Sequence, residues 1–104
     1  MDTRFRIVVT RDSVSCEHPD RKPESVRWDE VVRIWLVTTS NGPRTPDQWL
    51  LFESPSGGCS MPTEADGFDQ IWGVLKDHFP GFDYTRIIEA GTDDARYLCW
   101  ERNP

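Results

Sequence analysis

The fold of this chain is decided by residues 33–53, which read RIWLVTTSNGPRTPDQWLLFE. Successive side chains alternate between two faces, with period two, along 33–39 and again along 48–53, as in the strands of a sheet. The residues between them, 40–47, are rich in the Pro, Gly, Asn and Asp that favour turns. We therefore predict an antiparallel hairpin of two strands, 33–39 and 48–53.

The side chains of this hairpin also predict its register. If Thr38 pairs with Gln48, every cross-strand pair matches in character. The last pair, Arg33 with Glu53, joins opposite charges. A slip of one residue would turn apolar side chains to the wrong face. One face then holds Ile34, Leu36, Leu50 and Phe52, and the other holds Trp35, Val37, Trp49 and Leu51. We expect the second face, which ends in the charged pair, to be the outer one.

Shorter strands are predicted before this hairpin. Residues 5–10 and 13–17 alternate with period two and predict a first hairpin. Residues 18–24 contain two prolines and four charges, which predicts a loop. Residues 25–28 predict a short third strand with Val26 and Trp28 on one face, followed by a kink at 29–30.

A well-marked amphipathic helix is predicted over 63–79. Thr63 offers an N-cap, and Asp66 stands three residues later in a position like that of a capping box. The apolar stripe consists of Phe68, Ile71, Trp72, Leu75 and Phe79, and the opposite side carries Asp66, Asp69, Gln70, Gly73 and Asp77. We expect Trp72 to be among the most buried residues of the domain.

The remaining segments complete a single α+β domain over 1–104. Residues 59–61 predict a short edge strand stopped by Pro62, and Asp83 predicts the start of a second, shorter helix that ends at Gly91. In that helix Tyr84, Ile87 and Ile88 share one side. Residues 95–102 predict a final strand, with Leu98 and Trp100 on one face. We predict an antiparallel, strongly bent sheet packed against the main helix.

This order of elements, with the stretches RWDEVVRIWLVTT, WLLF and GFDQIWGVLKDHFPGFDYTRIIEA, resembles the pleckstrin-homology-like architecture and a group of small bacterial proteins of that general shape. The resemblance implies a binding scaffold more than an enzyme. It departs from true pleckstrin-homology domains, in which the helix is usually the last element, because a second helix and a strand follow here. Members that bind phosphoinositides use a basic early loop, whereas Arg21 and Lys22 are flanked here by Glu17, Asp20 and Glu24.

The charge of the chain is unevenly distributed. The net charge is −6, from 12 Lys and Arg against 18 Asp and Glu, and all of the imbalance lies from Ile34 onward. Nucleic acid and anionic membranes are poor partners for such a surface, and a basic protein is a better one. The chain has no apolar run of the roughly 18 residues that a membrane span needs. Because residues 1–4 alternate in charge and do not resemble a secretory signal, we expect a cytoplasmic protein.

Reactive or metal-binding motifs are not evident. The cysteines, Cys16, Cys59 and Cys99, are too widely spaced for a disulfide framework or a zinc knuckle, so we expect three free thiols. Cys16 and His18 share a face and could act as a nucleophile and its base, but their spacing alone does not provide the geometry that a catalytic pair needs. The favoured interpretation is a core thiol and a solvent-facing histidine. His78 complements the helix dipole, and the pair at 93–94 indicates a turn. We predict no catalytic residue, metal or cofactor.

These observations favour a non-enzymatic, acidic, cytoplasmic protein-binding module. Its most concrete form is an immunity-like or inhibitory protein directed at a basic partner. The predicted partner-binding residues are Trp35, Trp49, Asp66, Asp69 and Asp77. The alternative for the two tryptophans is burial beneath the second helix or the final strand. The alternative function is a small-ligand or lipid-headgroup binding domain of the pleckstrin-homology-like type, which would use the mouth of the sheet.

Overall fold

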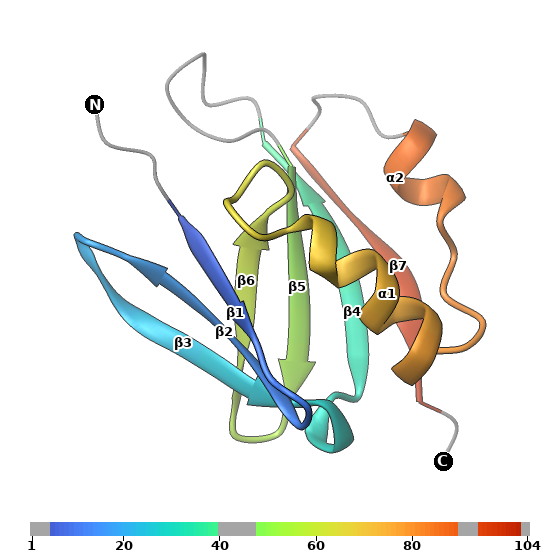
Figure 1. Cartoon of the computed structure of the whole chain (residues 1–104). Helices are drawn as coiled ribbons and strands as arrows, with labels where there is room; N and C mark the ends of the chain where they lie inside the picture. The colour runs from blue at the N-terminus through green and yellow to red at the C-terminus, as the bar shows by residue number, and fades with distance from the viewer. Residues whose placement is uncertain (1–4, 40–47, 90–93, 103–104) are drawn as a thin grey trace.

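The computed structural model describes residues 5–39, 48–89 and 94–102 (Figure 1). The strands are β1 (Arg6–Val9), β2 (Ser13–His18), β3 (Arg21–Arg27), β4 (Arg33–Thr38), β5 (Gln48–Ser54), β6 (Gly57–Pro62) and β7 (Ala95–Glu101). The α-helices are α1 (Asp69–His78) and α2 (Thr85–Glu89), and a 3-10 turn, η1 (Trp28–Glu30), replaces the predicted kink. The α+β class predicted from the sequence is confirmed.

The strands form two antiparallel sheets that do not close into a barrel. One has the order β1-β2-β3 and the other the order β6-β5-β4-β7. Figure 1 shows the two sheets inclined to each other, with α1 in front of the four-stranded sheet. They are joined at β3 and β6, where the Ser60 N–H donates to a Glu24 carboxylate oxygen at 2.8 Å. The carboxylate thus accepts from an N–H at the free edge of β6, where no neighbouring strand supplies an acceptor.

The register predicted for the central hairpin is confirmed along its whole length. Thr38 lies opposite Gln48, and the pairing continues without a shift to Arg33 opposite Glu53. The face predicted to be internal is fully buried, at 0 % exposure for Ile34, Leu36, Leu50 and Phe52. Matched cross-strand pairs therefore selected both the register and the face that enters the core.

Aromatic rings fill the core between the four-stranded sheet and α1. Phe79, at the end of α1, has its ring centroid 5.9 Å from that of Phe52 and 4.8 Å from that of Trp100. Trp28 lies 6.0 Å from both Phe52 and Phe79. One continuous core thus joins η1, the sheet and the helix.

The predicted loop at 18–24 is wrong, because most of it belongs to β3. The turn is confined to residues 19–20, where the Asp20 N–H donates to Nδ1 of His18 at 3.1 Å. Pro23 is tolerated because it lies where the β2–β3 register shifts and has no register partner on β2, at the edge of the sheet. The predicted edge strand at 59–61 is confirmed and is longer, as β6.

The predicted start of the main helix is also wrong, since α1 begins at Asp69 and not at Thr63. The preceding turn is held by β1 instead: the Asp66 N–H donates to the Phe5 carbonyl at 3.0 Å, and the Ile7 N–H donates to the Asp66 carbonyl at 2.9 Å. Gly67 follows at φ +90°, and a Cβ there would lie 2.8 Å from the Ile7 carbonyl oxygen. Pairing with β1 outweighs the capping signal at Thr63.

The side chains that α1 buries also differ from the predicted stripe. Trp72 is 41 % exposed, so its predicted deep burial is wrong, and Val74 is buried in addition to Ile71 and Leu75. Trp72 lies at the margin of the stripe, where its ring contacts those of Phe68 and Tyr84. Within the described residues, neither helix is long and apolar enough to cross a bilayer.

The C-terminal part follows the prediction in outline. The Asp83 carboxylate accepts hydrogen bonds from the Thr85 N–H at 3.1 Å and from the Thr85 hydroxyl, which starts α2. The predicted apolar side of α2 is only partly packed, because Ile88 is 81 % exposed. The predicted helix end at Gly91 lies outside the described residues. Strand β7 pairs with β4 as the edge of the four-stranded sheet.

Candidate partner-binding surface

The outer face of the four-stranded sheet is organised in cross-strand rows. Its central row is apolar and runs from Leu98 through Trp35 to Leu51, and these register partners lie on β7, β4 and β5. The row on one side is charged, and the row on the other side is mixed. The charged row is Glu101, Arg33 and Glu53, and the mixed row is Arg96, Val37 and Trp49. These nine residues are called the outer face below.

The charged row is a small ion network. The Arg33 Nε donates to Glu101 at 2.8 Å, and another guanidinium nitrogen donates to Glu53 at 3.2 Å. The hydrogen bond to Glu101, followed by the charge of Glu53, raises the pKa of Arg33 further above its ordinary value. Because these groups are partly exposed, the network contributes little to stability and serves to orient its members.

Trp35 is held in place from two sides. Its indole N–H donates to the second carboxylate oxygen of Glu53 at 2.8 Å, and the guanidinium carbon of Arg96 lies 4.6 Å from the ring centroid. The side chain is half-buried. A ring fixed before any partner arrives loses little conformational entropy on binding, which makes Trp35 a suitable anchor.

No described element packs over the central row. Helix α1 lies on the inner side, where Ile71 and Leu75 enter the core, and α2 directs Ile87 to the same core (Figure 1). Strand β7 extends the sheet and does not cover it, and its Leu98 is 39 % exposed. Neither the second helix nor the final strand therefore buries Trp35, although both had been possible covers.

Trp49 is placed differently from Trp35. Its ring makes an edge-to-face contact with Phe5 at 5.1 Å, and the guanidinium carbon of Arg21 lies 5.6 Å from its centroid. The segment before β1 and the start of β3 therefore flank Trp49, and it is half-buried. The outer face is most open along β7, where Arg96, Leu98 and Glu101 are exposed.

The structure does not unite the predicted acidic residues of α1 with Trp35. Asp69 and Asp77 are exposed on α1, which packs on the opposite side of the sheet from Trp35. Asp66 is exposed in the turn beside β1. Trp35 and the two aspartates of α1 therefore lie on opposite sides of the four-stranded sheet. In their place the structure adds Leu98 and Arg96, which sequence reasoning did not select.

The thiols and His18 are held by burial and by ring and turn contacts. Cys16, Cys59 and Cys99 are free and buried, as predicted. The His18 ring packs on Phe5 at 4.4 Å, and its Nδ1 accepts the turn hydrogen bond from Asp20. Among the described residues, no group of His, Cys, Asp and Glu side chains is arranged to hold a metal ion.

We expect the native thiols to be nearly inert at pH 8. Burial, the largest cause in each case, raises the pKa of Cys16 and Cys99 to about 11 and that of Cys59 to about 12. A pKa two units higher makes the thiolate about 100-fold scarcer, so labelling by a thiol reagent should slow at least in that proportion. Denatured, non-reduced protein should give three thiols, and fast native labelling or a count of one would contradict this arrangement.

The same pKa values predict a loss of stability in alkali. Folding raises each thiol pKa above the ordinary value of 9.0, so the native state holds these protons more tightly than the unfolded state. The resulting stabilisation is fully present below pH 9 and is lost as the pH rises toward 11–12.

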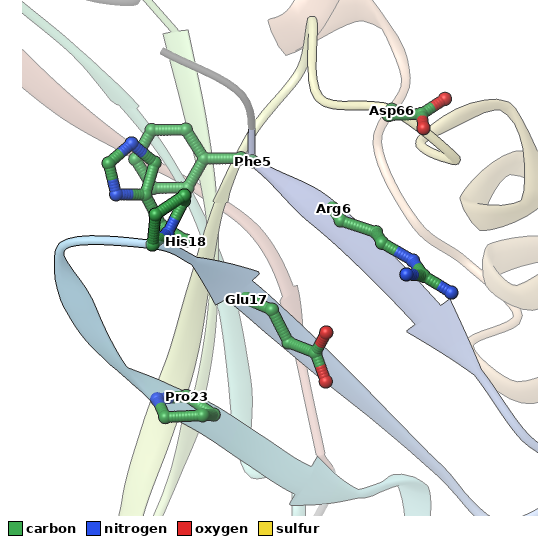
Figure 2. A pocket seen from close by; sticks show the side chains of 7 residues that line it. Phe5, Arg6, Glu17, His18, Pro23 and Asp66 are labelled. Carbon is green, nitrogen blue, oxygen red and sulfur yellow. The ribbon is translucent and has the colours of Figure 1, made fainter. Parts of the chain in front are cut away.

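A separate cavity of about 760 Å³ opens beside β1, β2 and the turn that contains Asp66 (Figure 2). Its lining is Phe5, Arg6, Glu17, His18, Pro19, Pro23 and Asp66. Arg6 is the one cationic residue in this lining, against two carboxylates. This charge balance does not favour the anionic headgroup that the pleckstrin-homology-like resemblance suggested.

No family model, curated protein or solved structure matches this chain. The functional argument therefore rests on the geometry of its own surfaces.

Proposed function

We propose that this chain is a non-enzymatic protein-binding module that contacts its partner through the outer face of the four-stranded sheet. The observation that carries the proposal is the central row, in which Trp35 and Leu51 are half-buried and Leu98 is 39 % exposed. The exposed Leu98 beside the half-buried, pre-oriented Trp35 is better explained by a contact made with another molecule than by the fold alone.

The composition of the outer face suits a protein partner more than a small ligand. Trp and Arg are the residues most enriched at binding hot spots, and here Arg96 packs on the ring of Trp35. The charged row of Arg33, Glu53 and Glu101 borders the apolar row as a polar rim. The pockets lined by described residues, including the cavity beside β1, open on other surfaces, and this face is offered as an extended contact area.

The net charge of −6 favours a basic partner. The outer face itself carries two arginines and two glutamates, so the acidity lies mostly on other surfaces, including Asp69 and Asp77 of α1. Those carboxylates would steer a basic partner by long-range attraction and would raise the association rate rather than form the contact. An immunity-like or inhibitory role toward such a partner, in the cytoplasm, is the most concrete form of this proposal.

The experiment that tests the proposal compares two exposed apolar residues. Affinity capture from native lysate with mass spectrometry supplies the partner. Leu98→Lys places a charge in the central row and should weaken binding by about tenfold or more, because the charge would be desolvated at the contact. Ile88→Lys makes the same chemical change on α2 and should leave affinity within about twofold, as expected for a surface substitution outside the interface.

Both variants should keep the far-ultraviolet spectrum and thermal midpoint of the parent protein, since both side chains are substantially exposed. If Ile88→Lys abolishes binding and Leu98→Lys does not, the contact lies on the helical side and the proposal is wrong.

A further inference from the structure

The cavity beside β1 has a floor made of rings. The Phe5 and His18 rings lie 4.4 Å apart, and Pro19 and Pro23 extend this lining along the start of β3. Figure 2 shows Phe5 over His18, with Arg6, Glu17 and Pro23 projecting from the neighbouring strands. The cavity and its seven lining residues are called the Phe5 groove below. Its volume of about 760 Å³ is large enough to hold several side chains of a ligand and far exceeds the space of a single ion.

Three charged side chains cross the Phe5 groove as a row with alternating signs. Arg6 on β1 pairs in register with Glu17 on β2, and on its other side it is bridged to Asp66. Neighbouring strands lie about 4.8 Å apart, so the two carboxylates stand on either side of the guanidinium. All three residues are exposed, and none forms an ion pair with another described residue. The row therefore carries one uncompensated negative charge.

Among the described residues, the charges next to the groove do not reverse this balance. Arg21 contacts the Phe5 ring but is paired with Glu24 at 3.6 Å. Asp20 and Lys22, at the turn and the start of β3, offset each other. The groove thus combines an apolar, ring-lined floor with a rim that is net acidic.

A ligand complementary to this groove needs an apolar part and a cationic end. Lysine and arginine side chains have that construction, since their methylene stems pack on apolar surfaces and their charged ends stay at a polar rim. A groove of this size accommodates several residues of an extended chain, so that two cations could approach Glu17 and Asp66 together.

We propose that the Phe5 groove binds an extended segment of a protein that carries lysine or arginine side chains. The aliphatic stems would lie on Phe5, Pro19 and Pro23, and the cations would approach Glu17 and Asp66. Arg6 would repel such a segment, because its positive charge stands between the two carboxylates. The proposal uses none of the residues of the outer face, and it holds whether or not that face binds a partner.

The test is a titration of the ¹⁵N-labelled full chain with two acetylated and amidated peptides at physiological salt. One peptide alternates lysine with leucine, and the other alternates glutamate with leucine. The lysine peptide should shift the amide signals of Arg6, Glu17 and Asp66. An exposed ion pair is worth up to about fivefold in affinity, so Glu17→Gln with Asp66→Asn should weaken binding by about tenfold.

Two further variants make the test specific. Asp69→Asn with Asp77→Asn removes the same charge from α1 and should change affinity by less than about twofold, since long-range effects are screened at this salt. Arg6→Gln should tighten binding of the lysine peptide by about twofold to fivefold, because it removes the one repelling charge. The sign of this change does not depend on whether the double variant at 17 and 66 folds as stably as the parent.

Several results would overturn the proposal. Equal weakening by the two double variants would mean that the peptide responds to net charge alone. Binding of the glutamate peptide, lost in Arg6→Gln, would make this a site for anions. A lysine peptide that produces no shifts at the groove would show that the groove does not bind such a segment.

Discussion

Replacing Phe79 by alanine is expected to lower the free energy of unfolding by about 3–5 kcal/mol, the usual range for a buried aromatic. Phe79 is 1 % exposed, and its ring contacts those of Phe52, Trp28 and Trp100. It therefore joins α1 to η1, to the centre of the sheet and to β7. A domain of this size has a stability of roughly 5–15 kcal/mol, so the variant would be barely stable.

Urea denaturation monitored by circular dichroism measures this change, with Trp72→Ala as the matched control on the same helix. Trp72 is 41 % exposed, so its loss should cost no more than about 1 kcal/mol, in the range of substitutions outside the core. A Trp72→Ala effect as large as that of Phe79→Ala would mean that the helix presents a different face to the sheet.

Replacing Trp35 by alanine is expected to weaken partner binding by at least about 2 kcal/mol, or roughly 30-fold, as at a binding hot spot. The substitution removes the largest side chain of the central row and leaves Glu53 and Arg96 without the ring that they contact. Most of the loss should appear as faster dissociation, because changes within one interface act mainly on that rate.

Surface plasmon resonance with the captured partner separates the two rates. Higher salt should slow association of the parent and of Trp35→Ala by the same factor, since steering depends on the acidic surface as a whole. Trp35→Phe keeps a ring over the sheet but loses the indole N–H, so its dissociation rate should fall between those of the parent and of Trp35→Ala. An unchanged dissociation rate in Trp35→Ala would remove Trp35 from the contact.

The pairing of the two central strands could be predicted because its information is local, whereas the predicted turn at 40–47 lies outside the described residues. Each side chain of 33–38 has a partner of matching character in 48–53, and only one register satisfies them all. The start of the helix could not be predicted in the same way. Thr63 has the chemistry of an N-cap, but the backbone of Asp66 pairs with β1, some sixty residues earlier, and no local pattern reveals that contact.

The candidate surface was predicted in part for a similar reason. Period-two alternation correctly placed Trp35 and Trp49 on the face opposite Leu36 and Leu50. The same rule grouped Leu98 with Trp100, whereas the register of β7 shifts between their partners, Trp35 and Ile34. This irregularity turns Leu98 to the outer face and Trp100 toward Phe79. A bulge leaves no signature in a short alternating strand, so Leu98 was missed.

The position of the acidic residues needed the three-dimensional structure. Charge counting identified the acidic part of the chain, but it does not say which carboxylates share a surface. The sheet separates Asp69 and Asp77 from Trp35, and the turn before α1 brings Asp66 to the Phe5 groove. In the proposed function, long-range attraction of the partner and direct contact with it are therefore assigned to different sides of the molecule.

Hydroxyl-radical footprinting of the chain with its captured partner tests the central claim most directly, because the sheet has reactive side chains on both sides. We predict that Trp35 and Leu98 become protected in the complex, while Trp72 and Ile88, exposed on the two helices, react as in the free protein. Protection of Trp72 and Ile88, with Trp35 and Leu98 unchanged, would contradict the assignment of the outer face as the partner-binding surface.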